Sequence, residues 1–341
     1  MQVLVAMSGG VDSSVAAALL RDAGHDVTGV TLRLWGGESD SGCCSVGDVE
    51  DARRVAAQLD VPHYVFDYAD EFEADVVAPY VAAYDRGVTP NPCVDCNRHF
   101  KFGRLLARAK VLGFDALATG HHARIVPDPD GRPRLARARD HAKDQSYVLV
   151  GLGADDLGHL AFPVGELTKA EVRERATALG LRTADKPESM DVCFVARRDR
   201  AAFVEARAGA RPGPVVDIDG RVVGEHAGIA RFTVGQRRGV GVATGERQYV
   251  VAVDAATHTV TVGPPVALLR DGVDVHDLRF VGPRPGPDEW IDVQTRAHGE
   301  PVRGRLVGDR VEFATPAARV APGQVVALYA GEVLLGGGVA G

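Results

Sequence analysis

The sequence predicts an α/β protein with a doubly wound parallel sheet, followed by a small central β-rich domain and a C-terminal β-barrel. In the first third of the chain, short apolar runs alternate with helical segments, which is the pattern of a parallel sheet. Beyond about residue 205, Gly and Pro become frequent and short Val-rich runs alternate with turns, which indicates β structure. We therefore expect three domains, at residues 1–205, 206–274 and 275–341.

The elements of the sheet are predicted from local patterns. The apolar run 3–6 predicts a buried strand, and the Ala/Leu-rich run 15–20 predicts a helix that ends at Gly24. Further strands are expected at 27–32, 64–66 and 116–119, and helices at 48–59, 71–84, about 98–112, and from a cap at Thr168 to Gly180. Ligands bind beyond the carboxyl ends of such strands, so Leu32 and Gly120-His121-His122 should border a pocket.

The later strands are expected at 215–220, 249–253 and 259–262, and a small barrel from about Val275 onward. Barrels of this size often serve as RNA-binding accessory domains.

A Ser/Gly turn, Ser8-Gly9-Gly10-Val11-Asp12-Ser13, joins the first strand to the first helix. Two glycines let the backbone approach a ligand closely, and the N-terminus of the helix adds partial positive charge, which suits a phosphate group. No Lys follows the glycines, so this is not a Gly-x-x-x-x-Gly-Lys phosphate loop. The alternative is an ordinary turn in which Asp and Ser cap a helix.

Composition narrows the class of protein. The 341 residues carry a net charge of −7, with 25% charged and 45% hydrophobic residues, which is ordinary for a soluble protein. This charge argues against a surface covered with basic patches, although a local groove for nucleic acid remains compatible with it. No apolar run has the length of a membrane span and no signal peptide is seen, so we expect a cytoplasmic protein that binds neither membrane nor DNA.

The five cysteines are Cys43, Cys44, Cys93, Cys96 and Cys193. A structural disulfide framework is not expected in the cytosol. Cys93-x-x-Cys96 on its own fits half a zinc site, a redox pair or cluster ligands, and the absence of a second Cys-x-x-Cys disfavours zinc. Pro90 and Pro92 rigidify this stretch, which favours an active-site loop over a helix.

The Ser/Gly turn resembles the PP-loop of the adenine-nucleotide α-hydrolase-like ATP pyrophosphatases, and further motifs make the resemblance specific. Together they are similar to the bacterial tRNA-specific 2-thiouridylases, the MnmA family, in order over nearly the whole chain. These motifs are Ser8–Ser13, Asn91-Pro92-x-x-x-Cys96-Asn97, Thr119-Gly120-His121, Lys143–Tyr147, Phe162–Leu167, Cys193-Phe194, Thr233–Arg237, Pro322-Gly323-Gln324 and Gly336–Gly338.

The resemblance implies a tRNA-uridine 2-sulfurtransferase that uses ATP and Mg²⁺ and forms AMP and pyrophosphate. Adenylation turns the C2 oxygen of the wobble uridine of tRNA for Glu, Gln and Lys into a leaving group, and a persulfide then delivers sulfur. By the motifs of the family, Cys193 carries the persulfide, and Cys96 is the nucleophile that ends in a disulfide with it. A cysteine desulfurase or a sulfur-relay protein is the implied partner besides tRNA.

The resemblance also implies binding roles. ATP would be bound by Ala6, Met7, Ser8, Gly9, Gly10, Val11, Asp12, Ser13, Leu32 and Gly120, with Asp12 placing Mg²⁺. The flipped target base would contact Asn91, Pro92 and Cys93. The tRNA would contact Lys143, Asp144, Gln145, Arg296 and Ala297, while His121 and Gln324 support the site.

The sequence departs from the family pattern at two positions. Many members have Asp where Cys93 stands, and that Asp has been cast as a general base; nearby Asp95 is a candidate substitute. Members can also have Tyr where this chain has Ala297, so some stacking on RNA is lost.

Three other hypotheses stay open at this stage. Cys93, Cys96 and Cys193 are enough thiolates to hold a 4Fe–4S cluster with one open iron that delivers hydrosulfide. A PP-loop nitrogen ligase that adenylates a small molecule needs no cysteine pair. An RNA-binding protein with a degenerate nucleotide site is the non-enzyme alternative.

Overall fold

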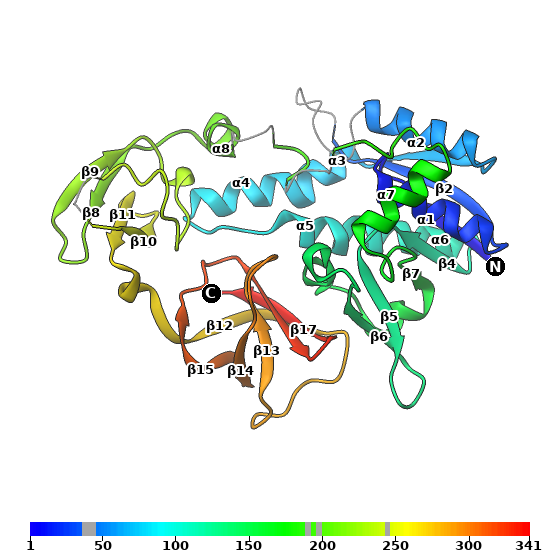
Figure 1. The fold of residues 1–341 in the computed structure, drawn as a ribbon. Coiled ribbons are helices and arrows are strands. Elements are labelled where there is room, and N and C mark those ends of the chain that lie inside the picture. Colours follow the sequence, from blue (N-terminus) through cyan, green and yellow to red (C-terminus); the bar gives the residue numbers. More distant parts are fainter. Residues whose placement is uncertain (36–45, 188–191, 196–199, 243–245) are drawn as a thin grey trace.

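A computed structural model describes residues 1–35, 46–187, 192–195, 200–242 and 246–341. Cys43 and Cys44 lie outside the described residues. Three sheets make up the fold, and they follow one another from the N-terminal to the C-terminal part of the chain (Figure 1).

The first sheet has five parallel strands in the order β3-β2-β1-β4-β7. They are β1 (Gln2–Ala6), β2 (Asp26–Arg33), β3 (His63–Asp67), β4 (Ala116–Thr119) and β7 (Leu160–Ala161). The helices of this part are α1 (Val11–Asp22), α2 (Val46–Gln58), α3 (Ala69–Phe72), α4 (Ala78–Asp85), α5 (Pro92–Asp95), α6 (Leu106–Val111) and α7 (Lys169–Ala178). Two π-helical segments, η1 (Glu73–Val77) and η2 (Cys96–Leu105), connect α3 with α4 and α5 with α6.

Both faces of this sheet are buried, because successive residues of β1 point to opposite sides. Val3 and Val5 pack with the apolar residues of α1, α2 and α7, whereas Leu4 packs with those of α4 and η2. The predicted doubly wound α/β sheet is therefore confirmed.

Local sequence signals account for the ends of two helices. Gly24 has a φ of +81° just after α1, as expected for a glycine that stops a helix. At α7 the Thr168 side chain accepts the N–H of Glu171, and the Glu171 carboxylate in turn accepts the N–H of Thr168 at 2.6 Å. This capping box fixes the start of α7, and it places Lys169 on its first turn.

The stretch around Cys93 forms a helix and not the loop that its prolines suggested. Pro92 is the first residue of α5, and helical backbone continues through η2 and α6 to Val111. Proline fits this first position because its missing N–H would have no partner there. Asn91 caps the helix by accepting the N–H of Cys93 at 3.2 Å.

The central part has a four-stranded sheet in the order β10-β11-β8-β9. It comprises β8 (Gly213–Val216), β9 (Val222–His226), β10 (Tyr249–Asp254) and β11 (Thr259–Gly263), and helix α8 (Arg200–Ala208) precedes it. Its own apolar cluster includes Val215, Phe232, Val250 and Val260.

The C-terminal part is a closed six-stranded antiparallel barrel, because β12 pairs with both β15 and β17. Its strands are β12 (Leu269–Phe280), β13 (Ile291–Gln294), β14 (Val302–Val307), β15 (Arg310–Ala318), β16 (Val325–Ala330) and β17 (Val333–Ala340). The barrel begins at Leu269 and not near Val275. A bulge lies inside β12, where the register shifts between Arg270 and Gly272.

A hairpin from the N-terminal part joins the barrel sheet. Strands β5 (Ala123–Pro127) and β6 (Pro133–Arg137) pair with each other, and β6 pairs with β17 where Val333 faces Ala136. Short 3₁₀ turns complete the chain at η3 (His141–Lys143), η4 (Ser146–Leu149), η5 (Ala154–His159), η6 (Ile229–Arg231) and η7 (Pro265–Leu268).

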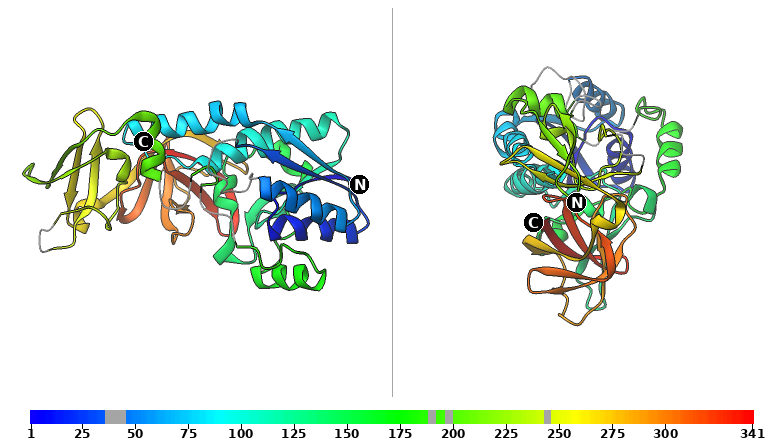
Figure 2. Two further views of the ribbon diagram at one scale, coloured as in Figure 1. Left: turned by 90° about the horizontal axis from the view of Figure 1, so that it is seen from above. Right: turned by 90° about the vertical axis from the view of Figure 1, so that its left-hand side faces the viewer.

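The molecule is elongated, with the parallel sheet at one end and the central sheet at the other (Figure 2). Helix α4 extends from the parallel-sheet end toward the central sheet, and the barrel lies beneath it (Figure 1). Within the described part of the chain, no helix is long and apolar enough to cross a membrane.

Candidate active site

The turn after β1 forms a cradle for an anion at the start of α1. Gly9 has a φ of +71°, and a Cβ there would come 2.2 Å from the carbonyl oxygen of Asp48, so only glycine fits. The Ser13 hydroxyl accepts the N–H of Ser8 at 3.1 Å and donates to the carbonyl of Gly10 at 3.1 Å. These bonds hold the turn closed around the first N–H groups of α1, which is the geometry that binds phosphate.

Gly120 closes the cradle from the neighbouring strand. It follows β4, and a Cβ on it would lie 2.5 Å from the Ser13 nitrogen and 2.7 Å from the Asp12 carbonyl carbon. The start of α1 can therefore lie against the end of β4 only because Gly120 has no side chain. Leu32 and Met7 are both buried, on β2 and just after β1 respectively.

The Asp12 carboxylate is held by two nitrogen donors. The Lys169 Nζ lies 2.7 Å from each of its oxygens, and the His122 Nε2 lies 3.1 Å from Oδ1. Burial opposes ionisation of Asp12, but the hydrogen bond from His122 and the charge of Lys169 outweigh it and lower the pKa of the carboxyl group. Asp12 is therefore an anion with a cation already at its side.

Lys186 links the cradle at Gly9 to helix α2. Its ammonium group donates to the Gly9 carbonyl at 3.0 Å and to the carboxylates of Asp48 and Asp51 at 2.7 and 2.6 Å. Burial opposes its charge, but the two carboxylates prevail and raise the pKa of Lys186. The lysine therefore stays charged and ties the turn to α2.

His121 is buried next to the cradle. Its Nδ1 lies 2.7 Å from the Thr119 hydroxyl, and its Nε2 lies 3.4 Å from the Lys101 ammonium. An ammonium group can only donate, so Nε2 accepts and Nδ1 carries the proton. Burial, with the charge of Lys101, lowers the pKa of His121 well below its ordinary range, so the ring is neutral.

Cys93 and Cys96 lie three residues apart on the helix that starts at Pro92, so they share one face of it. Cys96 is buried and Cys93 is half-buried. Asp95 is two residues from Cys93 and therefore points to a different face. Burial raises the pKa of Asp95, against the opposing charges of His99 and Arg98, but its position does not replace a carboxylate at residue 93.

Cys193 is placed in the region of Cys93 by its neighbour Phe194, which packs there. The ring of Phe194 packs at 5.3 Å from that of Tyr80, and the thiol of Cys93 is near enough to Tyr80 to add to the rise in its pKa, which burial mainly causes. Cys96 and Phe194 belong to one apolar cluster, and Cys193 packs against it. The two predicted reactive cysteines therefore come from distant parts of the sequence to one cluster.

The cysteines do not form a metal-binding group in this structure. Cys93, Cys96 and Cys193 are all described, and among the described residues no three His, Cys, Asp or Glu side chains are placed to hold a metal ion. The arrangement therefore does not fit the 4Fe–4S alternative. For Mg²⁺ the cradle offers the carboxylate of Asp12 at the start of α1, which suits an ion held chiefly by nucleotide phosphates.

The residues predicted to contact tRNA lie in different surroundings. Arg296 and Ala297 are exposed just after β13, and Gln145 is exposed beside His122, whose N–H its side chain accepts at 2.9 Å. Asp144, in contrast, is buried and paired with Arg137 at 3.0 Å, so its carboxylate has an internal role. Lys143 is half-buried at the end of η3. Direct contacts of these residues with RNA stay predictions.

Gln324 lies where the barrel meets the Cys93 helix. Its side chain donates to the Thr89 carbonyl at 2.7 Å, and the Thr89 N–H donates to the carbonyl of Pro322 at 2.8 Å. The barrel therefore holds the segment that leads into Asn91.

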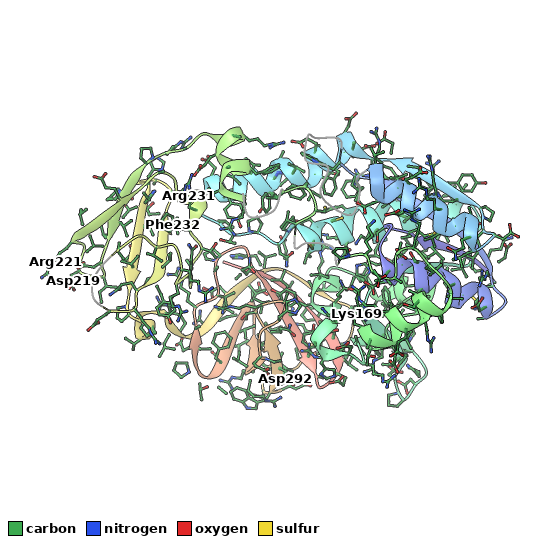
Figure 3. All side chains as sticks on the ribbon, turned by 45° about the horizontal axis from the view of Figure 1, so that its top comes forward. Lys169, Asp219, Arg221, Arg231, Phe232 and Asp292 are labelled. Carbon is green, nitrogen blue, oxygen red and sulfur yellow. The ribbon has the colours of Figure 1, made fainter. Side chains whose placement is uncertain are left out.

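Sequence reasoning placed His122 at the border of the pocket but missed Lys169 and Lys186. Lys169 directly follows the predicted cap Thr168, so a local signal for it was present in the sequence. Lys186 has no such signal, because only the tertiary fold brings it to Gly9. Figure 3 shows Lys169 on α7, far from the labelled residues of the central sheet.

The parallel sheet, the Ser8–Ser13 turn with no lysine in its own sequence, and the glycine at the end of β4 define a PP-loop nucleotide-binding protein. Comparison with known proteins narrows the class further. Sequence profiles described as the tRNA methyl transferase HUP domain, the tRNA methyl transferase PRC-barrel domain and the aminomethyltransferase beta-barrel domain match residues 1–197, 201–264 and 270–340.

Two relatives are similar over almost their whole length. The tRNA-specific 2-thiouridylase MnmA of Roseiflexus sp. (strain RS-1) is 49% identical over 99% of this chain and 98% of its own. That of Chloroflexus aggregans is 50% identical over 98% of this chain and 97% of its own. The chain belongs to the tRNA-specific 2-thiouridylase (MnmA) family, and the resemblance seen in the sequence is confirmed.

Solved structures are less similar. The tRNA thiolase NcsA of Methanococcus maripaludis, solved with its 4Fe–4S cluster, is 17% identical with a TM-score of 0.38, over 61% of this chain and 65% of its own. A 4-thiouridine synthetase solved with RNA and ATP is 16% identical with a TM-score of 0.38, over 60% of this chain and 49% of its own. These likenesses are too slight to bear on function.

Proposed function

We propose that this chain is an ATP-dependent tRNA-uridine 2-sulfurtransferase that acts on the wobble uridine and delivers sulfur from a persulfide on Cys193. The proposal is supported by a phosphate cradle and by two cysteines, distant in sequence, of which Cys96 belongs to an apolar cluster and Cys193 packs against the same cluster. Membership of the 2-thiouridylase family over nearly the whole chain supports it.

In the first step, the C2 oxygen of uridine attacks the α-phosphorus of ATP and pyrophosphate leaves. The Ser8–Ser13 turn, with its N–H groups at the start of α1, would bind the departing pyrophosphate. Lys169 and Asp12 stand at the same helix end and would meet the phosphates and their Mg²⁺. Mg²⁺ would supply charge neutralisation there.

In the second step, the terminal sulfur of the Cys193 persulfide attacks C2 and AMP leaves with the former C2 oxygen. The Cys96 thiolate then attacks the Cys193 sulfur, which breaks the persulfide bond, leaves sulfur on the base and forms a Cys96–Cys193 disulfide. A dithiol reductant restores the two thiols. The persulfide itself requires a cysteine desulfurase or a sulfur-relay protein as donor, and a cytoplasmic location is part of the proposal.

The target base would lie near Asn91, Pro92 and Cys93, at the start of the helix that carries Cys96. Because Asp95 points away from the face shared by Cys93 and Cys96, we assign no base role to it.

Nucleoside mass spectrometry tests the proposal. Unmodified tRNA for Glu is incubated with iron-free protein, Mg-ATP, a cysteine desulfurase and cysteine, beside Cys96→Ser and Cys193→Ser. We expect 2-thiouridine from the wild-type chain and from neither variant. Activity that needs added iron would favour the cluster hypothesis, and activity on no tRNA would favour a nitrogen ligase. Tight binding of tRNA without any ATP–pyrophosphate exchange would favour an RNA-binding protein.

A further inference from the structure

A buried glutamine at the end of a barrel strand organises the segment that carries Arg296. Gln294 is the last residue of β13 and only 3% exposed. Its amide nitrogen donates to the carbonyls of Arg296 at 2.9 Å and Ala297 at 3.0 Å. Both residues are themselves exposed, so one buried side chain sets the backbone course of an exposed turn.

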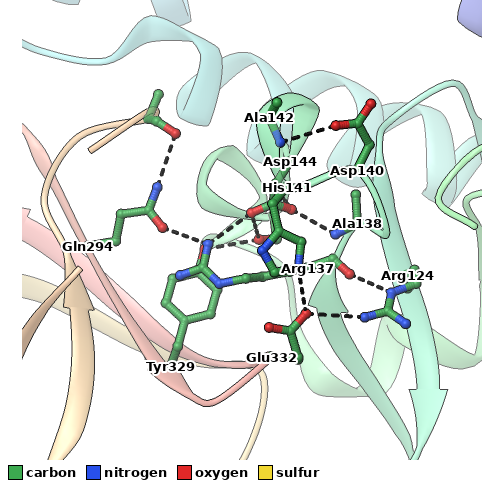
Figure 4. A network of polar contacts seen from close by, with 12 residues as sticks. Arg124, Arg137, Ala138, Asp140, His141, Ala142, Asp144, Gln294, Tyr329 and Glu332 are labelled. Atoms are coloured by element: carbon green, nitrogen blue, oxygen red, sulfur yellow. Dashed lines mark hydrogen bonds and ion pairs between the residues drawn. The ribbon is translucent and has the colours of Figure 1, made fainter. Parts of the chain in front are cut away.

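The other end of the same amide is held by the N-terminal part of the chain. The Gln294 oxygen accepts from Arg137 Nη1 at 2.7 Å, and Arg137 also pairs with Asp144 at 3.0 Å (Figure 4). The guanidinium lies over the ring of Tyr329, 3.7 Å from its centroid. Arg137 is thus fixed from three sides, at the point where β6 joins the barrel.

From Asp144 the contacts continue to the phosphate cradle. The Asp144 carboxylate accepts the N–H groups of Ala138 at 2.9 Å and Ser146 at 3.1 Å, which shapes the backbone on both sides of Gln145. Gln145 in turn pairs with the backbone of His122, and His122 donates to Asp12. A continuous set of partly or fully buried polar contacts therefore joins the Arg296 segment to the ATP cradle.

We propose that Gln294, held by Arg137, is a positioning residue that sets the distance and orientation of the Arg296–Ala297 segment relative to the ATP cradle. The inference rests on the proposed function, because the segment matters only if RNA binds there. RNA that contacts Arg296 would then present its target base at the cradle in one fixed register.

The amide is suited to this role because it accepts from a cation on one side and donates to two carbonyls on the other. A carboxylate would keep the bond to Arg137 but lose both donors. A methionine would fill a similar volume and lose both kinds of bond. Gln294→Glu tests the two bonds to the Arg296 segment while the bond to Arg137 is kept. Gln294→Met also removes the bond to Arg137, which docks the N-terminal part of the chain on the barrel.

The chain offers a matched control at Gln58. This exposed glutamine of α2 also donates to two successive carbonyls, of Leu179 at 2.9 Å and Gly180 at 3.2 Å, in the parallel-sheet part. Gln58→Glu and Gln58→Met make the same chemical changes away from the Arg296 segment, so they report on any general effect of losing such bonds.

The test measures KM for tRNA and kcat for 2-thiouridine formation, together with binding of a non-hydrolysable ATP analogue by calorimetry. We expect both Gln294 variants to raise KM for tRNA about tenfold, with analogue affinity and the melting temperature close to wild type. Both Gln58 variants should keep the wild-type KM. Wild-type KM in Gln294→Glu would show that docking alone matters and would overturn the proposal.

A double-mutant cycle with Arg296→Ala tests whether Gln294 acts through Arg296. If it does, Gln294→Glu adds no further rise in KM once Arg296 is removed. If KM for tRNA in the double variant rises by the product of the two single-variant factors, the residues act independently and the inference is wrong. A wild-type chain that binds no tRNA would instead refute the proposed function itself, before any variant is compared.

Discussion

The ammonium group of Lys169 lies equidistant from the two carboxylate oxygens of Asp12, 2.7 Å from each. Both residues stand at helix starts, Asp12 in the first turn of α1 and Lys169 in the first turn of α7. The Lys169 ammonium group is thereby held beside the N–H groups at the start of α1, where an anion would bind.

Lys169→Met should lower tRNA-dependent ATP–pyrophosphate exchange by about 10²-fold, since it removes a preorganised charge from the site of developing negative charge. Lys169→Arg should restore part of the rate. Lys110→Met is the control and should keep the wild-type exchange rate, because Lys110 forms an exposed ion pair with Asp156 at the surface. Exchange at the wild-type rate in Lys169→Met would exclude a role at the phosphates.

Gly120→Ala should weaken ATP binding, because its Cβ would have to displace the backbone of Asp12 and Ser13. A shift of the cradle by a fraction of an ångström to one ångström is expected to cost about 10²-fold in exchange activity. Gly286→Ala is the matched control, since a Cβ there meets no atom within 4 Å. Equal ATP affinity in both variants would refute the close approach of Gly120 to the backbone of Asp12 and Ser13.

Phe194→Leu should slow sulfur transfer but leave adenylation unchanged. The Phe194 ring packs against Trp35, Phe72, Tyr80 and Phe203 at centroid distances of 5.3–5.9 Å, and it fixes the residue next to Cys193. Leucine keeps an apolar side chain but loses the ring contacts, worth about 0.5–1.5 kcal/mol for each pair. We expect a lower rate of 2-thiouridine formation with normal pyrophosphate exchange. An equal loss in both assays would indicate general unfolding.

The stability of the fold should fall in mild acid because of His63. Burial, with the charge of Arg53, lowers the pKa of His63 from its ordinary value of 6.5 to about 4. The Thr31 hydroxyl donates to the Met7 carbonyl and accepts from His63 Nε2, while Nδ1 is buried without a hydrogen-bond partner. As the pH falls from about 6.5 to about 4, His63 becomes protonated in the unfolded chain but stays neutral in the folded chain.

The free energy of unfolding should therefore decrease across that window and change no further below it on account of this residue. Denaturant titrations at several pH values, with His63→Gln as the reference, measure the effect. A constant difference between the two proteins from pH 7 to pH 4 would contradict the assignment.

Local sequence patterns predicted the parallel sheet and its cradle well, because a strand, a Gly turn and a helix are adjacent in the chain. They gave a wrong prediction at Pro92, which begins a helix because its neighbour Asn91 provides a cap.

Partners from distant segments could not be predicted from sequence. Lys186 reaches Gly9 and Arg137 reaches Gln294 only through the tertiary fold. The family resemblance implied that Asp144 contacts tRNA, whereas in the fold its carboxylate is buried and paired with Arg137. Residues predicted by family motifs thus gain their roles from neighbours that the motifs do not include.

The most direct test of the central claim is a single turnover without reductant, with the chain carrying a ³⁴S persulfide and supplied with Mg-ATP and unmodified tRNA for Glu. Peptide and nucleoside mass spectrometry then follow the label. We predict ³⁴S in 2-thiouridine and one Cys96–Cys193 disulfide formed for each thiolated base. Labelled product without that disulfide, or equal product from Cys96→Ser, would contradict sulfur transfer through the two cysteines.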